Sequence, residues 1–326
     1  MPKKEIKKHL FDHLWDVWCI VSVVGIWPRF IEPQLLKTTH LSLPIRDLPE
    51  DLKGLKILQF SDLHLHRDVP DRFLEKILKK VNSLEPDLIV FTGDFLCNAQ
   101  MQEEERLLKF LNSFHAPYGC YAIVGNHDYE DTISVNERGE YDIVDARSAD
   151  IVKGFKRLFS TIHLIKQTTE RAKQLQVHQG LIDLLKKTPF TLLKNQSELL
   201  SIGNSHLNIC GLGEYMLADH NLEKTFQNYD RKYPGLILAH NPDTAPQLSN
   251  YPGDVILCGH THGSQVNLPY IRTKFVVLEN KNLTKGLHQL KDKWVYVNRG
   301  VGSTFPFRWF STPELMLLTL EPKNEV

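Results

Sequence analysis

Five short polar clusters in this 326-residue chain each follow an apolar run of the length of a β-strand. This pattern limits what the chain can fold into more than any other feature. The clusters are Asp62-Leu-His64, Gly93-Asp94, Gly125-Asn-His-Asp128, His240-Asn241 and Gly259-His-Thr-His262. Sheet scaffolds place functional side chains in loops at strand ends, and parallel strands bring their carboxyl ends to one edge. We therefore expect the five clusters to converge.

Apolar runs alternate with helical patterns in the first part of the chain. Strands are expected at 55–60, 87–91 and 119–124, with helices at 70–83 and 103–114 between them. This β-α-β-α-β order predicts a mostly parallel sheet that carries helices. A proline-containing connection over 28–54, with a strand near 38–45, precedes it.

The second part of the chain has strand-like runs with few helices between them. The runs are 191–193, 206–210, 236–239, 254–258, 275–278, 294–297 and 314–320. A second, mixed sheet packed face to face on the first is the simplest arrangement. Residues 129–187, between the two parts, contain no ligand pattern. We interpret them as a mostly helical insertion, with helices at 151–159 and 181–185, which serves either as a lid over the site or as a peripheral decoration.

The charge and cysteine content exclude some classes of partner and site. Lysine plus arginine and aspartate plus glutamate each number 39, so nothing draws the chain as a whole to nucleic acid. The five cysteines form no closely spaced pair, which argues against a disulfide framework or a zinc knuckle. A reducing compartment fits this cysteine content. We expect no nucleic-acid partner, and the sequence predicts no protein partner.

Residues 1–30 form a basic and aromatic N-terminal segment in which several lysines precede Trp15, Trp18 and Trp27. The uncharged stretch between Asp16 and Arg29 has 12 residues, whereas a helix that spans a bilayer needs about 20. Tryptophan is favoured at the headgroup level of a membrane. We therefore expect an amphipathic, membrane-associating segment that lies on the surface. A spanning anchor and a helix packed on the domain remain alternatives; a cleaved signal peptide is disfavoured because no small-residue cleavage site follows.

The polar clusters supply oxygen and imidazole ligands and no thiolate. Such a mixture suits Mn²⁺, Fe, Zn²⁺ or Co²⁺ rather than Ca²⁺. Two ions ~4 Å apart clamp a phosphate and activate water near neutral pH. Any one of these residues has an ordinary structural explanation, such as a turn aspartate or a core histidine. The five clusters together predict a metal site.

The ordered motifs D-x-H, GD, GNHD, H and GHTH resemble the calcineurin-like metallophosphoesterase superfamily over roughly residues 55–320, with 129–187 unmatched. The resemblance implies an α/β fold, an α/β/β/α sandwich of two mixed sheets flanked by helices, formed by residues 31–326. It also implies roles for individual residues. Asp62, His64 and His262 would hold one ion, Asn126, His240 and His260 a second, and Asp94 would bridge both. His127 would be catalytic, and Asp128 would orient its imidazole through a hydrogen bond.

Within the superfamily, the D-L-H-L start and the segment Asn298-Arg-Gly-Val-Gly302 resemble the branch of the YkuE- and YaeI-type phosphoesterases and the LpxG-type UDP-2,3-diacylglucosamine pyrophosphatases. That resemblance implies a lipid-nucleotide substrate: UDP-2,3-diacylglucosamine would be hydrolysed at its pyrophosphate to UMP and 2,3-diacylglucosamine 1-phosphate, in lipid A synthesis. A hydroxide bridging two ions, most simply Mn²⁺, would attack. Residue chemistry alone reaches only a phosphoesterase. A phosphodiesterase or phosphatase of broader specificity, and a non-catalytic scaffold of the same fold, therefore remain alternatives.

Two arginines near the end of the chain are the predicted substrate-binding residues. Arg299 and Arg308 lie beside an aromatic run at 305–310, and a guanidinium can bind phosphate through two hydrogen bonds. The alternative is that the aromatics belong to the core and the arginines to the surface. The thiols and the nucleotide substrate favour the cytoplasmic face of the inner membrane as the location, with peripheral attachment.

Overall fold

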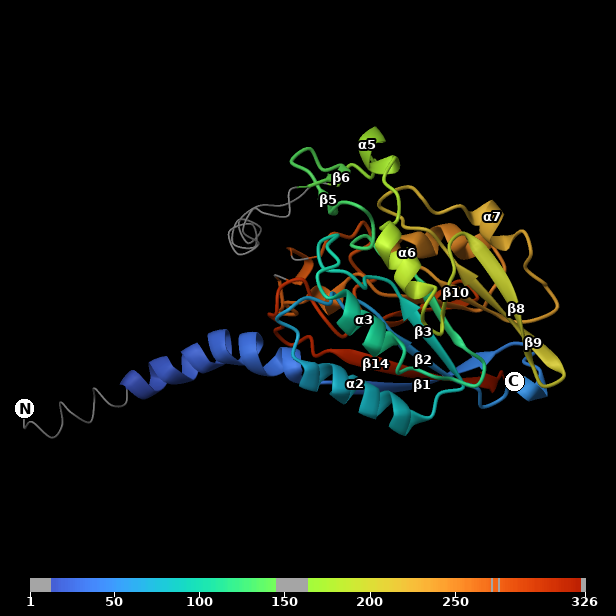
Figure 1. The fold of residues 1–326 in the computed structure, drawn as a ribbon, viewed down its shortest axis with the longest axis horizontal. Helices are drawn as coiled ribbons and strands as arrows, with labels where there is room; N and C mark the ends of the chain where they lie inside the picture. Colours follow the sequence, from blue (N-terminus) through green and yellow to red (C-terminus); the bar gives the residue numbers. More distant parts are fainter. Residues whose placement is uncertain (1–12, 145–163, 271, 275, 324–326) are drawn as a thin grey trace, which may run out of the picture.

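The computed structural model describes residues 13–144, 164–270, 272–274 and 276–323. Two six-stranded mixed sheets pack face to face, and helices cover their outer faces (Figure 1). This is the α/β/β/α sandwich that the sequence predicts. Its layers matter for function because the parallel strands of both sheets end at the same edge of the molecule.

The first sheet has the strand order β1-β14-β2-β3-β4-β7. Its strands are β1 (Lys37–Ile45), β2 (Lys56–Phe60), β3 (Leu88–Thr92), β4 (Cys120–Ile123), β7 (Phe190–Leu192) and β14 (Glu314–Pro322). Strands β2, β3, β4 and β7 pair in parallel, and β14 runs antiparallel to β2. The buried faces of β2, β3 and β4 explain their nearly uninterrupted apolar sequences, as expected for strands covered on both sides.

The second sheet has the order β12-β13-β11-β10-β9-β8. Its strands are β8 (Gln196–Ile202), β9 (Ser205–Gly211), β10 (Gly235–Leu238), β11 (Val255–Cys258), β12 (Gly286–Leu290) and β13 (Lys293–Val297). Strands β9, β10, β11 and β13 are parallel, and β8 and β12 close the two edges as antiparallel hairpin partners.

Three apolar layers hold the sandwich together. Side chains such as Ile57, Val90 and Leu257 fill the space between the sheets. On the outer face of the first sheet lie α2 (Asp71–Leu84), α3 (Glu104–Leu111) and α6 (Gln179–Leu185). On the outer face of the second sheet lie α7 (Leu222–Phe226) and the 3-10 segment Pro242–Asn250. Helix α2 follows the expected pattern, with Phe73 and Ile77 buried toward the sheet.

The insertion at residues 129–187 differs in part from the sequence prediction. It contains α5 (Glu170–Lys173) and α6, which covers the expected helix at 181–185. It also contains a short antiparallel hairpin of β5 (Ile133–Val135) and β6 (Tyr141–Ile143), which we had not expected. The helix expected at 151–159 lies outside the described residues.

The strand assignments in the second part of the chain need three corrections. The runs at 191–193 and 314–320 are strands, but β7 and β14 join the first sheet rather than the second. Residues 276–278 are not a strand. Their apolar side chains are nevertheless used: Leu278 is buried, and Val277 packs against the insertion. Strands β8 and β12 were missed because these edge strands mix polar and apolar residues and contain no continuous apolar run.

The N-terminal helix, His13–Gln34, projects from one end of the sandwich (Figure 1). At 22 residues it is long and apolar enough to cross a membrane by length and composition, and only 6% of its apolar window is buried. It is longer than the 12 uncharged residues suggested, because the helix continues through Arg29. Both a surface-lying and a spanning placement are therefore compatible with its length.

Candidate metal centre

The five polar clusters do converge. Asp62, Asp94 and Asn126 follow β2, β3 and β4 in the first sheet, and His240 and His260 follow β10 and β11 in the second. Because these strands are parallel within each sheet, their carboxyl ends meet where the two sheets face each other. The side chains lie buried or half-buried at this edge.

The backbone of the clusters is strained in a way that ordinary loops avoid. Five of the seven expected ligands have a left-handed φ: Asp62 (54°), His64 (43°), Asp94 (64°), His260 (70°) and His262 (50°). Non-glycine residues rarely adopt this region, and such strain gathers at functional sites. Close approach also demands glycine here, since a Cβ on Gly125 would lie 2.2 Å from Asp94 Oδ1.

Asp62, His64 and His262 form the first ligand group, with one ligand atom of each lying within 4.8 Å of the others. The Nε2 atoms of His64 and His262 are 3.1 Å apart, and His262 Nε2 is 3.7 Å from Asp62 Oδ1. The other oxygen of Asp62 accepts a hydrogen bond from the Ser61 hydroxyl. These three residues could hold a metal ion, and they are the ones to which the resemblance assigns the first ion.

The second group surrounds Asp94. Its Oδ2 lies 3.4 Å from His64 Nε2 and 3.2 Å from His240 Nε2, between the two ligand sets. Asn126 Oδ1 and His260 Nδ1 face each other at 2.9 Å. Asp94 thus lies between the two groups, and the structure brings together all seven residues that the sequence singled out.

The donor set fits a cation. His64 Nδ1 contacts the Leu96 carbonyl at 3.1 Å, and His262 Nδ1 contacts the Gly302 carbonyl at 3.1 Å. Since only a protonated nitrogen bonds a carbonyl, both Nδ1 atoms carry the hydrogen and both Nε2 atoms present lone pairs. Two lone pairs that face each other at 3.1 Å in a buried site repel unless positive charge lies beside them. Carbonyl partners on the far nitrogen are typical of metal-ligating histidines.

The pKa shifts show that the carboxylates need positive charge. Burial alone would raise the pKa of Asp94, but the charge of His240, with those of His127 and His64, holds it well below its usual value. Burial would lower the pKa of His240, yet Asp94 raises it well above the usual value. Burial lowers the pKa of His64 to about 3 and raises that of Asp62 to about 7. Asp94 thus takes its compensating positive charge from His240, and a bound divalent cation would supply that charge in its place.

His127 lies beside the ligand groups. Asp128 supports the site through other contacts than the sequence predicts. The backbone N–H of His127 donates to Asp94 Oδ1 at 2.9 Å, and its ring centroid is 4.8 Å from that of His64. Asp128 was expected to orient the imidazole of His127. Instead, both of its oxygens accept backbone N–H groups: Oδ2 from Asp94 and Gly125, and Oδ1 from Phe95 and Leu96, at 2.8–2.9 Å. Asp128 therefore fixes the loop that carries Asp94.

The structure also corrects the expected role of the two arginines. Arg308 is fully buried, and its guanidinium donates to the carbonyls of Arg299 (2.8 Å), Ser311 (3.0 Å) and Gly302. The guanidinium of Arg299 is held by the buried Glu314, with Nη2 to Oε1 at 2.9 Å. Both arginines therefore stabilise the 298–314 segment, and the fully buried guanidinium of Arg308 is not presented to a second phosphate. Burial of a charged side chain is not visible in sequence.

Comparison with known proteins agrees with this geometry. The model of the calcineurin-like phosphoesterase family matches residues 55–264, which is more than half of the chain. The chain belongs to the calcineurin-like phosphoesterase family. It is also 40% identical over 307 residues to the UDP-2,3-diacylglucosamine pyrophosphatase LpxG of Chlamydia trachomatis, covering 90% of this chain and 92% of that protein.

More distant relatives extend over most of the chain. The metallophosphoesterase YkuE of Bacillus subtilis is 30% identical, covering 91% of this chain and 90% of its own length. The phosphodiesterase YaeI of Escherichia coli is 27% identical, covering 81% and 82%. This phosphoesterase is therefore a hydrolase of phosphoester or pyrophosphate bonds, and it binds divalent metal.

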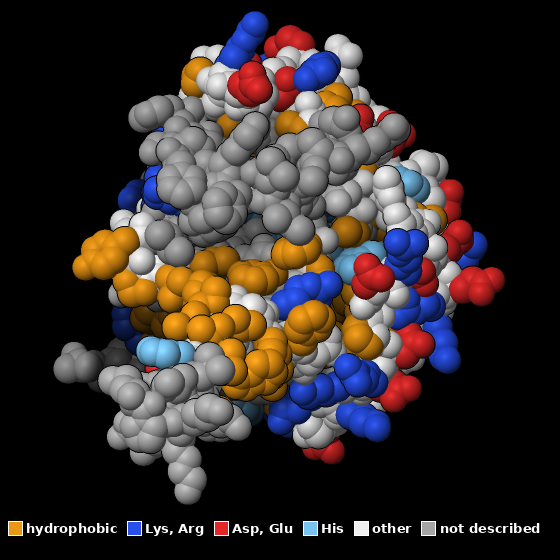
Figure 2. Space-filling model, turned by 90° about the vertical axis from the view of Figure 1, so that its left-hand side faces the viewer, with side chains coloured by type: hydrophobic (Ala, Val, Ile, Leu, Met, Phe, Trp, Pro, Cys, Tyr) orange, Lys and Arg blue, Asp and Glu red, His pale blue; other side chains and the backbone are white. Residues whose placement is uncertain are grey.

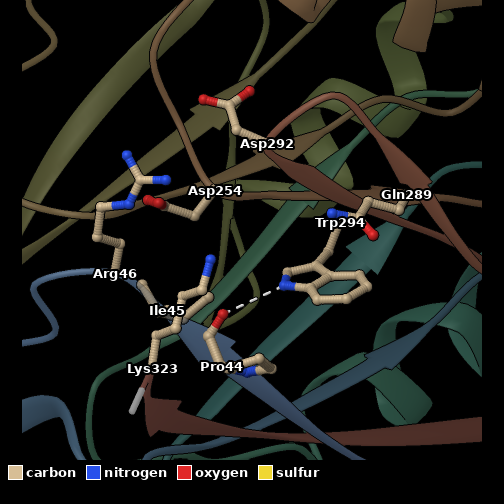
Figure 3. Close-up of a pocket in the computed structure, with 8 residues that line it drawn as sticks. All are labelled: Pro44, Ile45, Arg46, Asp254, Gln289, Asp292, Trp294 and Lys323. Carbon is tan, nitrogen blue, oxygen red and sulfur yellow. Dashed lines mark hydrogen bonds between the residues drawn. The ribbon is translucent and has the colours of Figure 1, made fainter. Parts of the chain in front are cut away.

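The pocket shown in Figure 3 is not this site. It lies between Pro44, at the end of β1, and Asp254 and Trp294, at the starts of β11 and β13, and Trp294 Nε1 donates to the Pro44 carbonyl at 3.2 Å. Because the metal ligands follow the opposite ends of β2 and β11, the pocket lies at the other edge of the sandwich. The chemistry of this phosphoesterase belongs to the carboxyl-end edge.

Proposed function

We propose that this phosphoesterase hydrolyses UDP-2,3-diacylglucosamine to UMP and 2,3-diacylglucosamine 1-phosphate, a step in the synthesis of lipid A. The observation that carries the proposal is the 40% identity to LpxG over nearly the full length of both chains, together with the presence of all seven expected ligand positions. We propose two divalent cations, with Mn²⁺ as the expected ion. Oxygen and imidazole ligands without thiolate favour it over softer ions.

The ligands divide into two sets in this proposal. Asp62, His64 and His262 would hold one ion, Asn126, His240 and His260 would hold the other, and Asp94 would contribute to both. Two such ions, when bound, neutralise phosphoryl oxygens and make water a better nucleophile. In the reaction, the oxygen of water bonds to one phosphorus, the bridging P–O bond breaks, and the departing phosphate keeps the electron pair.

His127 is the proposed catalytic side chain that does not hold metal. Its backbone is fixed by Asp94 Oδ1 at 2.9 Å, and its half-exposed ring lies beside His64. From this position the imidazole can donate a hydrogen bond to a phosphoryl oxygen, or a proton to the departing phosphate. Loss of one such donor typically costs about 10²–10³ in kcat.

Product analysis tests the substrate. Purified protein with added Mn²⁺ should release UMP from UDP-2,3-diacylglucosamine, and His127→Asn should lower kcat by about 10² while leaving bound metal unchanged. The matched control is His288→Asn, a half-buried histidine on β12, which should be unaffected. The relative YaeI, a phosphodiesterase, supports a broader-specificity alternative. Hydrolysis of simple phosphodiesters without UMP release from the lipid nucleotide would favour that alternative.

We also propose that the N-terminal helix attaches the enzyme to the membrane that holds its lipid substrate. Trp15 (58%), Trp18 (56%) and Phe30 (64%) are largely exposed, although tryptophan and phenylalanine normally bury their surface. Figure 2 looks onto the end from which the helix projects, and hydrophobic side chains gather in the centre of that face. We favour peripheral contact on the cytoplasmic face, with a spanning anchor as the alternative.

A basic stripe on α2 supports a contact with anionic lipid. Arg72, Lys76 and Lys79 are exposed at helical spacing on one side of α2, opposite its buried face. Lys76 Nζ donates to the Gln34 carbonyl at 2.9 Å, so the stripe adjoins the base of the N-terminal helix. Each lysine or arginine near an anionic surface contributes about 1 kcal/mol.

Vesicle sedimentation tests the attachment. Trp15→Ser with Trp18→Ser should weaken binding to anionic vesicles, because both side chains leave water on binding. Leu287→Ser, an exposed apolar residue of β12, is the control. Unchanged sedimentation of the double variant would exclude the helix as the attachment.

A further inference from the structure

A buried carboxylate ties the base of the N-terminal helix to the loop at 308–312. Glu32 is only 2% exposed. Its Oε2 accepts hydrogen bonds from Trp27 Nε1 at 3.0 Å and from the Phe310 backbone at 2.9 Å. Its Oε1 accepts from the Ser311 backbone at 2.6 Å and from Thr312 Oγ1 at 3.3 Å. Four donors from two distant segments therefore meet on one side chain, as a buried charge requires.

The same loop supports the proposed metal ligand His262 in two ways. Ser311 Oγ donates to the backbone carbonyl of His262 at 2.6 Å. The buried guanidinium of Arg308 donates to the carbonyls of Ser311 and Gly302, and the Gly302 carbonyl accepts from His262 Nδ1 at 3.1 Å. The main chain and the ring orientation of His262 thus both rest on this loop.

Further contacts dock the helix on the neighbouring residues. The Pro28 carbonyl accepts from the Arg308 backbone at 2.8 Å. Arg29 Nη1 donates to the Pro306 carbonyl at 3.2 Å, and its guanidinium lies 5.7 Å from the Phe305 ring centroid. The helix base and the loop therefore form one hydrogen-bonded unit beside the metal centre, and most of its bonds converge on Glu32.

We propose that Glu32 is a positioning residue, which holds the 308–312 loop so that His262 points at its ion. Metal affinity then depends on the docked N-terminal helix, although the helix contributes no ligand. Outer partners of this kind fix ring orientation, and losing one typically costs 10–100-fold in metal affinity. The inference rests on the metal centre proposed above and is independent of the lipid-nucleotide substrate.

Calorimetric titration of metal-stripped, full-length protein with Mn²⁺ tests this directly. Glu32→Gln keeps the size of the side chain but replaces one acceptor oxygen with an amide that faces two donors. It should bind Mn²⁺ about tenfold more weakly than the wild type. Glu50→Gln, at an exposed carboxylate that pairs with exposed Lys53 at 3.3 Å, should bind like the wild type. Equal affinity of Glu32→Gln and wild type would overturn the proposal. A wild type that binds no ion would instead overturn the metal centre itself.

A double-mutant cycle separates positioning from general damage. Ser311→Ala removes the hydroxyl that reaches the His262 carbonyl and leaves its backbone bond to Glu32 in place. If Glu32 acts through this loop, the variant with both Glu32→Gln and Ser311→Ala should bind Mn²⁺ little worse than the single variant of lower affinity. The effects of coupled residues on binding free energy do not add in full. Losses that multiply in full would show independent effects and contradict the proposal. Trp27→Phe, which removes one of the four donors to Glu32, should give a smaller loss of about two- to threefold.

Discussion

Replacing Asp128 with asparagine should destabilise the protein through the backbone of the Asp94 loop. The carboxylate is fully buried and accepts four backbone N–H groups, two on each oxygen, at 2.8–2.9 Å. Asparagine keeps the volume but turns one oxygen into an amide, so two buried donors lose their acceptor. Each such donor costs about 1–3 kcal/mol, which gives about 2–6 kcal/mol.

The raised pKa of Asp128 narrows the range of the expected loss in unfolding free energy. Burial, followed by the charge of Asp94, raises the pKa of Asp128 to about 7, so its charged form is already costly in the folded protein. We therefore expect a loss of about 2–3 kcal/mol in the free energy of unfolding, toward the lower end of that range.

Urea unfolding of metal-stripped protein, followed by tryptophan fluorescence, measures this loss. Asp183→Asn on α6 is the control, because that exposed carboxylate contacts two exposed side chains, Lys186 at 2.9 Å and Gln179 at 3.1 Å, and should change stability by less than about 0.5 kcal/mol. An Asp128→Asn variant with an unchanged unfolding midpoint and an altered pH profile of hydrolysis would show that Asp128 does not stabilise the Asp94 loop. The expected hydrogen bond to the His127 imidazole would then be its role.

Three further predictions concern removal of the metal, stability in acid and the buried Arg308. Chelation should lower the unfolding temperature measured by calorimetry, since a ligand at 100 times its Kd stabilises by about 2.7 kcal/mol; an unchanged temperature would argue against resident metal. Burial alone would raise the pKa of Glu314, but other contacts, chiefly hydrogen bonds from Arg299, hold this pKa below its usual value. Its stabilisation is then present above the usual glutamate pKa of about 4.3 and lost as pH falls, so Glu314→Gln should flatten the acid limb of a stability profile, and parallel limbs would contradict this. Arg308→Met should weaken Mn²⁺ binding in the same calorimetric titration as Glu32→Gln. An unaltered Kd for Mn²⁺ would show that Arg308 does not support the orientation of His262.

Much of the site could be predicted because its signal is local. Each ligand cluster directly follows a short run of buried apolar residues, as in Leu88–Thr92 before Asp94, and strand ends of one sheet must meet. The order of the clusters along the chain then indicated the family. The roles of the seven ligand positions came from the family resemblance, and their convergence also requires that the two sheets face each other.

The remainder depends on contacts between distant segments. Nothing in the sequence around Glu314 or Phe190 indicates that β14 and β7 pair with the first sheet, since strand partners are set by global packing. Arg308 is predicted to bind phosphate until its burial is known, and three of the four hydrogen bonds of Asp128 come from backbone 32–34 residues away. Glu32 gives no sequence signal beyond an acidic residue after an apolar helix, because its four donors come mostly from the far end of the chain.

The number of ions bound per chain tests the central claim most directly. Native mass spectrometry of protein loaded with Mn²⁺ should show two ions on the wild type. Asp94→Ala, which removes the side chain that lies between the two ligand sets, should retain one ion or none. A wild type that saturates at a single ion, or an Asp94→Ala variant that still holds two, would contradict the two-ion centre.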